Sequence, residues 1–140
     1  MNQNKLSDQL VVDEGRRRRI YQDTVGKWTG GVGRNLSDRE FSDDEIALML
    51  KNDIAIVVRE LDLNLPWWHI LSHARQNVLA NMCFNMGINR LLGFKKMLAA
   101  IVMKRYDDAA KEMLNSKWAK QVGQRAVRLA EMMRTGEFLE

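Results

Sequence analysis

Four glycines crowd into eight positions of this chain and exclude a helix there. They are Gly26, Gly30, Gly31 and Gly33, separated by apolar, aromatic and hydroxyl side chains. Glycine weakens a helix interior, but it supplies the positive backbone angles that tight turns need. A segment of this composition is typical of a short, strongly turned β-hairpin. The sequence therefore predicts a small antiparallel lobe in an otherwise helical chain.

The segment that precedes the hairpin has helical periodicity. Residues 5–14 place Leu6, Leu10 and Val11 on one helical face, and Gly15 follows as a helix stop. A helix of about ten residues is only marginally stable alone, so we expect it to pack on the helical part of the chain.

The clearest helix signal is a capping box that follows the hairpin. Ser42 stands at the N-cap and Glu45 lies three residues on, so each can satisfy a backbone N–H of the other. The apolar residues that follow at helical spacing are Ile46, Met49, Leu50, Ile54, Val57, Val58 and Leu61. The pattern predicts a long helix of about 20 residues.

Helical patterns continue to the end of the chain. Pro66 opens a short element, and the final helix spans about 124–134 before Gly136. These patterns predict an α+β, mainly α fold in a single domain, 1–140. Its parts are a β-lobe at about 15–41, a connecting helix at about 42–62, and a helical lobe at about 63–140 that includes the N-terminal helix 4–14.

The composition restricts the function classes without choosing one. A net charge of +4 favours anionic partners, such as nucleic acid, anionic lipid or a bacterial envelope. No segment approaches the length of a membrane span, and the N-terminus "MNQNKLSDQL" lacks the apolar core of a secretory signal. We therefore expect a soluble protein that is made in the cytosol and does not insert stably into a membrane.

The run Arg16–Arg19 does not by itself indicate nucleic-acid binding. In a strand alternate side chains face opposite sides, so four arginines cannot form one patch. Tyr21 and Trp28 are interleaved with basic residues, but no recognition module is present. The passage from Gly30 to Gly33 lacks the lysine and hydroxyl of a phosphate-binding loop. A solvated surface is the expectation, and nucleic acid is not an expected partner.

The residues that usually bind metals are too few for a convincing site. His69 and His73 are four apart, but neither a third ligand nor an intervening glutamate accompanies them. The single Cys83, between Met82 and Phe84, is interpreted as a small buried hydrophobe. No metal and no organic cofactor are expected.

Two carboxylates on either side of the arginine run could support acid–base chemistry. Glu14 ends the first helix, Asp23 lies nine residues on, and Thr29 follows six residues after that. Glycosidic hydrolysis needs two carboxyl groups, one to protonate the leaving oxygen and one to activate water. By position alone, Glu14 is better interpreted as a solvated acid at a helix end, since most acidic side chains are exposed.

Four collinear segments together resemble the phage-type lysozymes of glycoside hydrolase family 24, the family of T-even phage lysozyme. The segments are "DEGRRRRIYQDTVGKWTGGVG", "NMCFNMG", "GFKKML" and "SKWAKQVGQRAVRLAEMMRTGEF". The resemblance covers nearly the whole chain. It implies a lysozyme-like fold, in which a long helix joins a small β-hairpin lobe to a larger helical lobe.

The resemblance also implies roles for individual residues. Glu14 matches the catalytic proton donor, Asp23 the second carboxylate, and Thr29 the threonine that holds the attacking water. Asn85 matches a polar position that faces the cleft, and Arg125 matches an arginine that approaches the catalytic glutamate.

The resemblance also gives expectations for residues near the candidate catalytic groups, and at two positions this chain departs from the family pattern. Arg128 is expected to meet Asp13. Gly33 and Arg34 are expected to contribute to substrate binding, although Arg34 stands where the family often has histidine. Gly30 replaces a branched apolar residue, so we expect a looser strand than in relatives.

The function implied by the resemblance is that of an endolysin. Such an enzyme hydrolyses the β-1,4 bond between N-acetylmuramic acid and N-acetylglucosamine in bacterial peptidoglycan, generally with inversion. It would be a monomer that is released from the host cytoplasm with a holin and acts in the periplasm or cell wall. Two alternatives remain open: a lytic transglycosylase on the same bond, and a non-catalytic protein that binds peptidoglycan or disrupts membranes.

Overall fold

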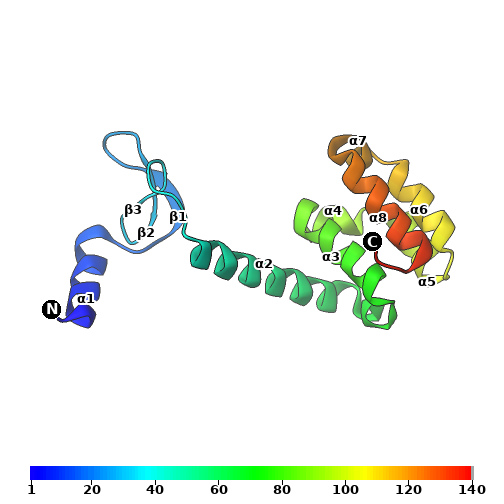
Figure 1. Ribbon diagram of the computed structural model, residues 1–140, viewed down its shortest axis with the longest axis horizontal. Coiled ribbons are helices and arrows are strands. Elements are labelled where there is room, and N and C mark those ends of the chain that lie inside the picture. The colour runs from blue at the N-terminus through cyan, green and yellow to red at the C-terminus, as the bar shows by residue number, and fades with distance from the viewer. Residues whose placement is uncertain (140) are drawn as a thin grey trace. The chain divides into compact units, whose positions relative to one another are not determined.

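A computed structural model describes residues 1–139 of the chain (Figure 1). Over this range the chain forms eight α-helices, one 3-10 helix and a three-stranded sheet. In chain order the elements are α1 (Gln3–Glu14), β1 (Arg17–Gln22), β2 (Trp28–Gly31), β3 (Arg34–Asn35), α2 (Asp43–Asn64), η1 (Pro66–Ile70), α3 (His73–Met86), α4 (Ile88–Leu92), α5 (Lys95–Val102), α6 (Tyr106–Leu114), α7 (Lys117–Val122) and α8 (Gln124–Thr135). The predicted α+β, mainly α class is confirmed.

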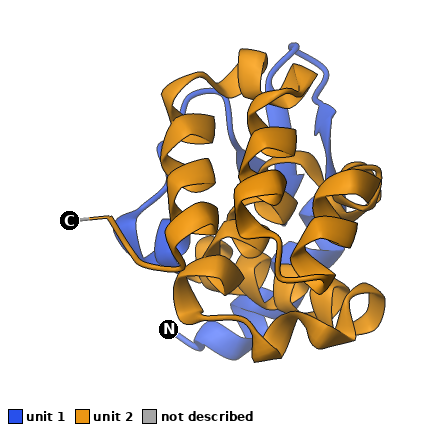
Figure 2. Cartoon of the chain, turned by 90° about the vertical axis from the view of Figure 1, so that its right-hand side faces the viewer, with its two compact units in different colours: residues 1–47 blue, residues 48–140 orange. Residues whose placement is uncertain are grey.

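The chain divides into two compact units, which Figure 2 shows in different colours. Unit 1 comprises residues 1–47 and unit 2 comprises residues 48–140, so the boundary falls inside α2. The expected packing of α1 on the helical lobe and the predicted lobe boundaries therefore stay predictions.

Local signals at its two ends account for the length of α1. The side chain of Asn2 accepts a hydrogen bond from the Lys5 N–H at 3.0 Å, which caps the first turn. At the other end Gly15 takes a φ of 79° and donates its N–H to the Val11 carbonyl at 3.0 Å. The predicted glycine stop is confirmed, and it leaves Glu14 as the last residue of the helix.

The glycine-rich segment forms an antiparallel sheet in the order β1-β2-β3. Tyr21 pairs with Thr29 in the first hairpin, and Thr29 pairs with Asn35 in the second. The predicted hairpin is confirmed. The two-residue strand β3 was not expected, because arginine followed by asparagine has little intrinsic strand preference.

The arginine run leads into β1 and continues along it. Arg17, Arg18 and Arg19 are exposed, as expected for a solvated charged strand. The Arg17 guanidinium lies 5.1 Å from the centroid of the Tyr21 ring, a cation–π contact along the strand. The pairing of β1 with β2 has an irregular register between Arg17 and Tyr21. The run therefore connects α1 to the hairpin and leaves its charges in solvent.

The predicted capping box starts α2. The Ser42 hydroxyl accepts from the Glu45 N–H at 3.2 Å, and Glu45 Oε1 accepts from the Ser42 N–H at 2.8 Å. Asp43, Asp44 and Glu45 place three negative charges in the first turn, where the helix dipole favours them. This reciprocal cap fixes the Glu45 carboxylate at the entrance to the helix.

Unit 2 is a helical bundle around one apolar core (Figure 2). Its fully buried side chains come from α2, α3, α4, α5, α6 and α8, and the largest are Leu61, Leu79, Met82, Leu91, Met97, Ile101, Met113, Met133 and Val78. Two sequence predictions are confirmed here: Pro66 opens η1, and α8 ends at Thr135 with Gly136 in the left-handed conformation. Among the helices of residues 1–139, none combines the length and hydropathy that a bilayer-spanning segment requires.

Candidate active site

Glu14 lies at the end of α1 directly against Gly33, in the turn between β2 and β3. A β-carbon added to Gly33 would stand 2.6 Å from Glu14 Oε2 and 2.8 Å from Glu14 Cδ. Gly33 also has a φ of 61°, a conformation that side chains rarely adopt. Glycine at this position therefore serves both the turn and the close approach of the carboxyl group.

Asp23 lies in the turn between β1 and β2, where the main chain holds its carboxylate. Oδ1 accepts hydrogen bonds from the N–H groups of Val25 at 3.0 Å and Lys27 at 2.8 Å. Among residues 1–139, no hydrogen bond is made to its other oxygen, Oδ2. The carboxylate is fixed through one oxygen, and the second is available to a water molecule.

Thr29 is brought to Asp23 by the carbonyl oxygen of Lys27. The Thr29 hydroxyl donates to this carbonyl at 3.1 Å, and the Asp23 N–H donates to it at 2.8 Å. Among residues 1–139, Thr29 is the one polar residue that is buried, with 5% of its surface exposed. Its oxygen can still accept a hydrogen bond, because donating one uses only its proton.

Arg34 directs its guanidinium to the start of α2. Nη2 donates to Glu45 Oε1 at 2.8 Å and to the Glu40 carbonyl at 3.0 Å, and Nη1 pairs with Glu45 Oε2. The guanidinium carbon also lies 5.3 Å from the Phe41 ring centroid. The expected role of Arg34 in substrate binding stays a prediction, and these contacts point to a role within unit 1 itself.

Gly30 has no side chain, and side chains of neighbouring residues lie close to the position that a β-carbon would take. Gly30 is buried, and an added β-carbon would lie 3.2 Å from Leu36 Cδ1 and 3.5 Å from Ile20 Cγ2. Leu36 and Ile20 therefore fill part of the volume that a branched residue would take. Whether the strand is looser than in relatives stays a prediction.

Asn85 and Arg125, the two candidates in unit 2, each hydrogen-bond to a residue of another helix. Asn85 on α3 accepts a hydrogen bond from Trp118 Nε1 at 2.8 Å. Arg125 on α8 donates from Nε to Asn81 Oδ1 at 2.9 Å, beside a groove of about 360 Å³. The expected approaches of Arg125 to Glu14 and of Arg128 to Asp13 join different units, so they stay predictions.

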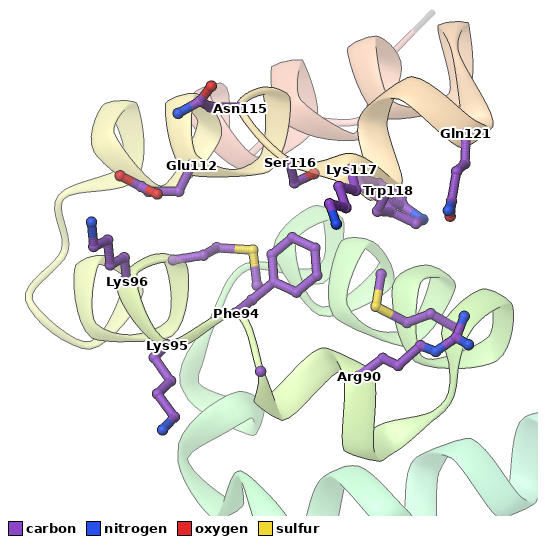
Figure 3. A pocket seen from close by; sticks show the side chains of 13 residues that line it. Arg90, Phe94, Lys95, Lys96, Glu112, Asn115, Ser116, Lys117, Trp118 and Gln121 are labelled. Carbon is purple, nitrogen blue, oxygen red and sulfur yellow. The ribbon is translucent and has the colours of Figure 1, made fainter.

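A larger open pocket of about 680 Å³ lies among α4, α5, α6 and α7 (Figure 3). Phe94 and Trp118 line it and meet edge to face, with ring centroids 6.2 Å apart. In the view of Figure 3, Lys117 and Glu112 lie above the Phe94 ring and Arg90 lies below it. Among the candidate residues of unit 2, Asn85 accepts a hydrogen bond from Trp118 of this pocket, whereas Arg125 is not part of its lining.

In the described part of unit 2, the cysteine and His69 show no sign of a catalytic or metal-binding role. Burial raises the pKa of the Cys83 thiol, which disfavours the nucleophilic thiolate and agrees with the interpretation as a buried hydrophobe. His69 contacts Asp62, which also accepts from Trp68 Nε1 at 2.8 Å. Within residues 1–139, no group of three His, Cys, Asp or Glu is placed to hold a metal ion.

Comparison with known proteins decides the family. A family model described as "Phage lysozyme" matches residues 12–134 of the chain. The chain belongs to the phage lysozyme family. It is a glycoside hydrolase of the lysozyme type. The matched range includes Glu14, Asp23 and Thr29, which the resemblance of the sequence motifs had singled out.

Curated relatives agree with this assignment. The chain is 30% identical to "Probable T4-type lysozyme 1" of Dictyostelium discoideum, and the alignment covers 94% of each chain. It is 27% identical to "Probable T4-type lysozyme 2" of the same organism, over 96% of each. It is also 26% identical to "Pre-baseplate central spike protein Gp5" of Enterobacteria phage T4, over 95% of this chain but 28% of that protein.

Several residues that contact the candidate site residues of this lysozyme were not predicted from the sequence. Lys27 acts through its main-chain N–H and carbonyl, and no side-chain pattern reveals that role. Glu45 was assigned to the helix cap but also pairs with Arg34. Asn81 lies four residues before Asn85 on α3, so helical spacing could have placed it on the same helix face, but no sequence signal identifies Arg125 as its partner.

Proposed function

We propose that this lysozyme is an endolysin: a muramidase that hydrolyses the β-1,4 bond between N-acetylmuramic acid and N-acetylglucosamine in bacterial peptidoglycan. The observation that carries the proposal is the joint placement of the candidate groups in unit 1. Glu14 contacts Gly33 of the second hairpin, and Thr29 of the same hairpin shares the Lys27 carbonyl with Asp23. Membership of the phage lysozyme family supports the reaction type.

In the proposed reaction Glu14 is the general acid. Its carboxyl proton passes to the glycosidic oxygen as the bond from that oxygen to the anomeric carbon breaks. Asp23 accepts a proton from the attacking water through Oδ2, and the Thr29 oxygen accepts a hydrogen bond from the same water. The water then adds to the face opposite the leaving group, which inverts the anomeric configuration.

The proposed setting is a bacterium infected by a phage. The enzyme is made as a monomer in the host cytoplasm, passes the inner membrane with the help of a holin, and acts in the periplasm or cell wall. A net charge of +4 supports attraction to an anionic envelope. Neither nucleic acid nor stable membrane insertion has a part in the proposal.

The decisive experiment is digestion of purified sacculi followed by mass spectrometry of the new glycan ends. We expect reducing N-acetylmuramic acid ends that carry one added water, with the α-anomer formed first. Anhydro-muramyl ends would instead establish a lytic transglycosylase. The variant Glu14→Gln keeps the size of the side chain but removes its acidic proton. If folded Glu14→Gln clears sacculi at the parental rate, catalysis by Glu14 is wrong, and a non-catalytic action gains support.

A further inference from the structure

Arg34 joins β3 to the N-terminus of α2 through two parallel contacts. Its Nη2 and Nη1 meet the two oxygens of Glu45, and Nη2 also reaches the Glu40 carbonyl. Paired contacts of this kind fix orientation as well as distance, because both planar groups must align. The Arg34 side chain is only 19% exposed, so solvent screens the pair less than it would a surface ion pair.

The Glu45 end of the pair is itself anchored. Oε1 of Glu45 accepts from the Ser42 N–H at 2.8 Å, and the Glu45 N–H donates to the Ser42 hydroxyl. Glu45 cannot leave Arg34 freely without also breaking this cap. The first turn of α2 is therefore a fixed support for the guanidinium.

The other end of Arg34 lies next to the candidate acid. Gly33 precedes Arg34 in the chain, and it contacts the carboxyl group of Glu14. The ladder that holds this turn is short: β3 has two residues, Thr29 pairs with Asn35 and Gly30 with Arg34, and the Leu36 N–H adds one hydrogen bond to the Trp28 carbonyl at 2.7 Å. A ladder of this length leaves much of the positioning of Gly33 to side-chain contacts.

We propose that Arg34 is a positioning residue: paired with Glu45, it fixes Gly33 and thereby the carboxyl group of Glu14. The inference rests on the proposed function of Glu14. Arg34 has no contact with the substrate in this proposal, and its effect passes through the main chain of Gly33. Loss of the pair lets the turn move, and Glu14 then spends less time where it can protonate the glycosidic oxygen.

The test compares Arg34→Met, Glu45→Gln and the double variant on soluble glycan strands of alternating N-acetylglucosamine and N-acetylmuramic acid. Glu45→Gln keeps an acceptor for the Ser42 N–H while it removes the charge that pairs with Arg34. Asp38→Asn is the control, because it breaks the exposed ion pair between Lys27 and Asp38 in the same lobe. We expect Arg34→Met to lower kcat about tenfold with KM changed less than twofold, since small misplacements of a catalytic group cost this much or more.

The double variant shows whether Arg34 and Glu45 affect kcat through the contact between them or independently of each other. Glu45→Gln lowers kcat in the same direction, the double variant is no worse than Arg34→Met, and Asp38→Asn keeps the parental kcat. Arg34→Lys gives a second, milder variant, which retains the charge but cannot form two parallel contacts. Parental kcat in folded Arg34→Met and Arg34→Lys, or additive losses in the double variant, overturns the proposal.

A nuclear Overhauser measurement separates this inference from the proposed function. The Gly33 α-protons and Glu14 γ-protons give a cross-peak in the parent, and the peak weakens in Arg34→Met but not in Asp38→Asn. A peak of parental intensity in Arg34→Met refutes positioning, whatever the activity. An active Glu14→Gln refutes the proposed role of Glu14 and leaves the effect of Arg34 on the turn measurable by this cross-peak.

Discussion

Gly33 and Glu14 are in direct contact: a β-carbon on Gly33 would stand 2.6 Å from Oε2 of the glutamate. Gly31, two residues earlier, has the same φ of 61° but no atom within 4 Å of such a carbon. The two glycines therefore form a matched pair. At both positions a side chain would be strained by the left-handed backbone conformation. Only at Gly33 would that side chain also meet the carboxyl group of Glu14.

The first prediction uses this pair. Gly31→Ala and Gly33→Ala should each destabilise the fold by about 1–2 kcal/mol, since an L-residue at positive φ is strained. Only Gly33→Ala should lower kcat, by about 100-fold, because its methyl group displaces the Glu14 carboxyl. Urea unfolding and initial rates of sacculus digestion measure the two effects. Equal kcat values in the two folded variants would contradict the expectation.

The second prediction concerns Asp23. The variant Asp23→Asn keeps an oxygen that accepts from the Val25 and Lys27 N–H groups but removes the base. We expect it to fold with parental stability and to lose about 100-fold or more in kcat, the scale of general base catalysis. Asp23→Ala loses the turn contacts as well, so its unfolding free energy should fall by about 1–2 kcal/mol. Full activity in Asp23→Asn would remove Asp23 from the reaction.

The third prediction concerns the Thr29 hydroxyl. Thr29→Val has nearly the same shape but lacks the hydroxyl that donates to the Lys27 carbonyl at 3.1 Å. We expect kcat to fall about tenfold or more, with a smaller change in KM, because the attacking water loses a partner. Thr29→Ser restores the hydroxyl and should recover most of kcat. If the serine and valine variants have the same kcat, the hydroxyl does not act on water.

The fourth prediction is a pH dependence of stability at Asp62. The hydrogen bond from Trp68 Nε1, and next the contact with His69, lower the pKa of Asp62 below its ordinary value of 3.8. A carboxylate whose folded pKa is lowered stabilises the fold above the unfolded pKa and loses that effect as pH falls through the folded pKa. The melting temperature of the parent should therefore exceed that of Asp62→Asn at pH 7. The gap should close below about pH 4, whereas a gap independent of pH would contradict this origin.

The fifth prediction uses the single thiol. Cys83 is 3% exposed, and burial raises its pKa, so the native thiol should react with an aromatic disulfide no faster than the chain unfolds. In denaturant the same thiol should react within seconds. A Cys83→Ala variant gives the blank. Complete labelling of the native protein within a minute would show that the thiol is accessible.

Local signals allowed much of this fold to be predicted. The stop at Gly15 and the reciprocal cap of Ser42 and Glu45 involve residues three or four apart, so sequence spacing contains the needed information. The glycine crowding likewise predicted the hairpin, because positive φ is a property of single residues. Strand β3 was missed since Arg34–Asn35 pairs only in the presence of β2.

The contacts of the candidate site were harder to predict than its members. Motif resemblance selected Glu14, Asp23 and Thr29, but the Lys27 carbonyl that joins the last two belongs to the main chain. The pairing of Arg34 with Glu45 spans eleven residues and depends on the turn between them. Such contacts follow from tertiary structure, and no periodicity in the sequence indicates them.

The turn that holds Asp23 has an implication for how this enzyme can diversify. Both hydrogen bonds to its carboxylate come from peptide N–H groups, which every residue except proline supplies. The identities of the side chains at Val25 and Lys27 are thus uncoupled from the placement of this carboxylate. A lineage, or a combinatorial library, can vary these two side chains while the Asp23 carboxylate stays in place.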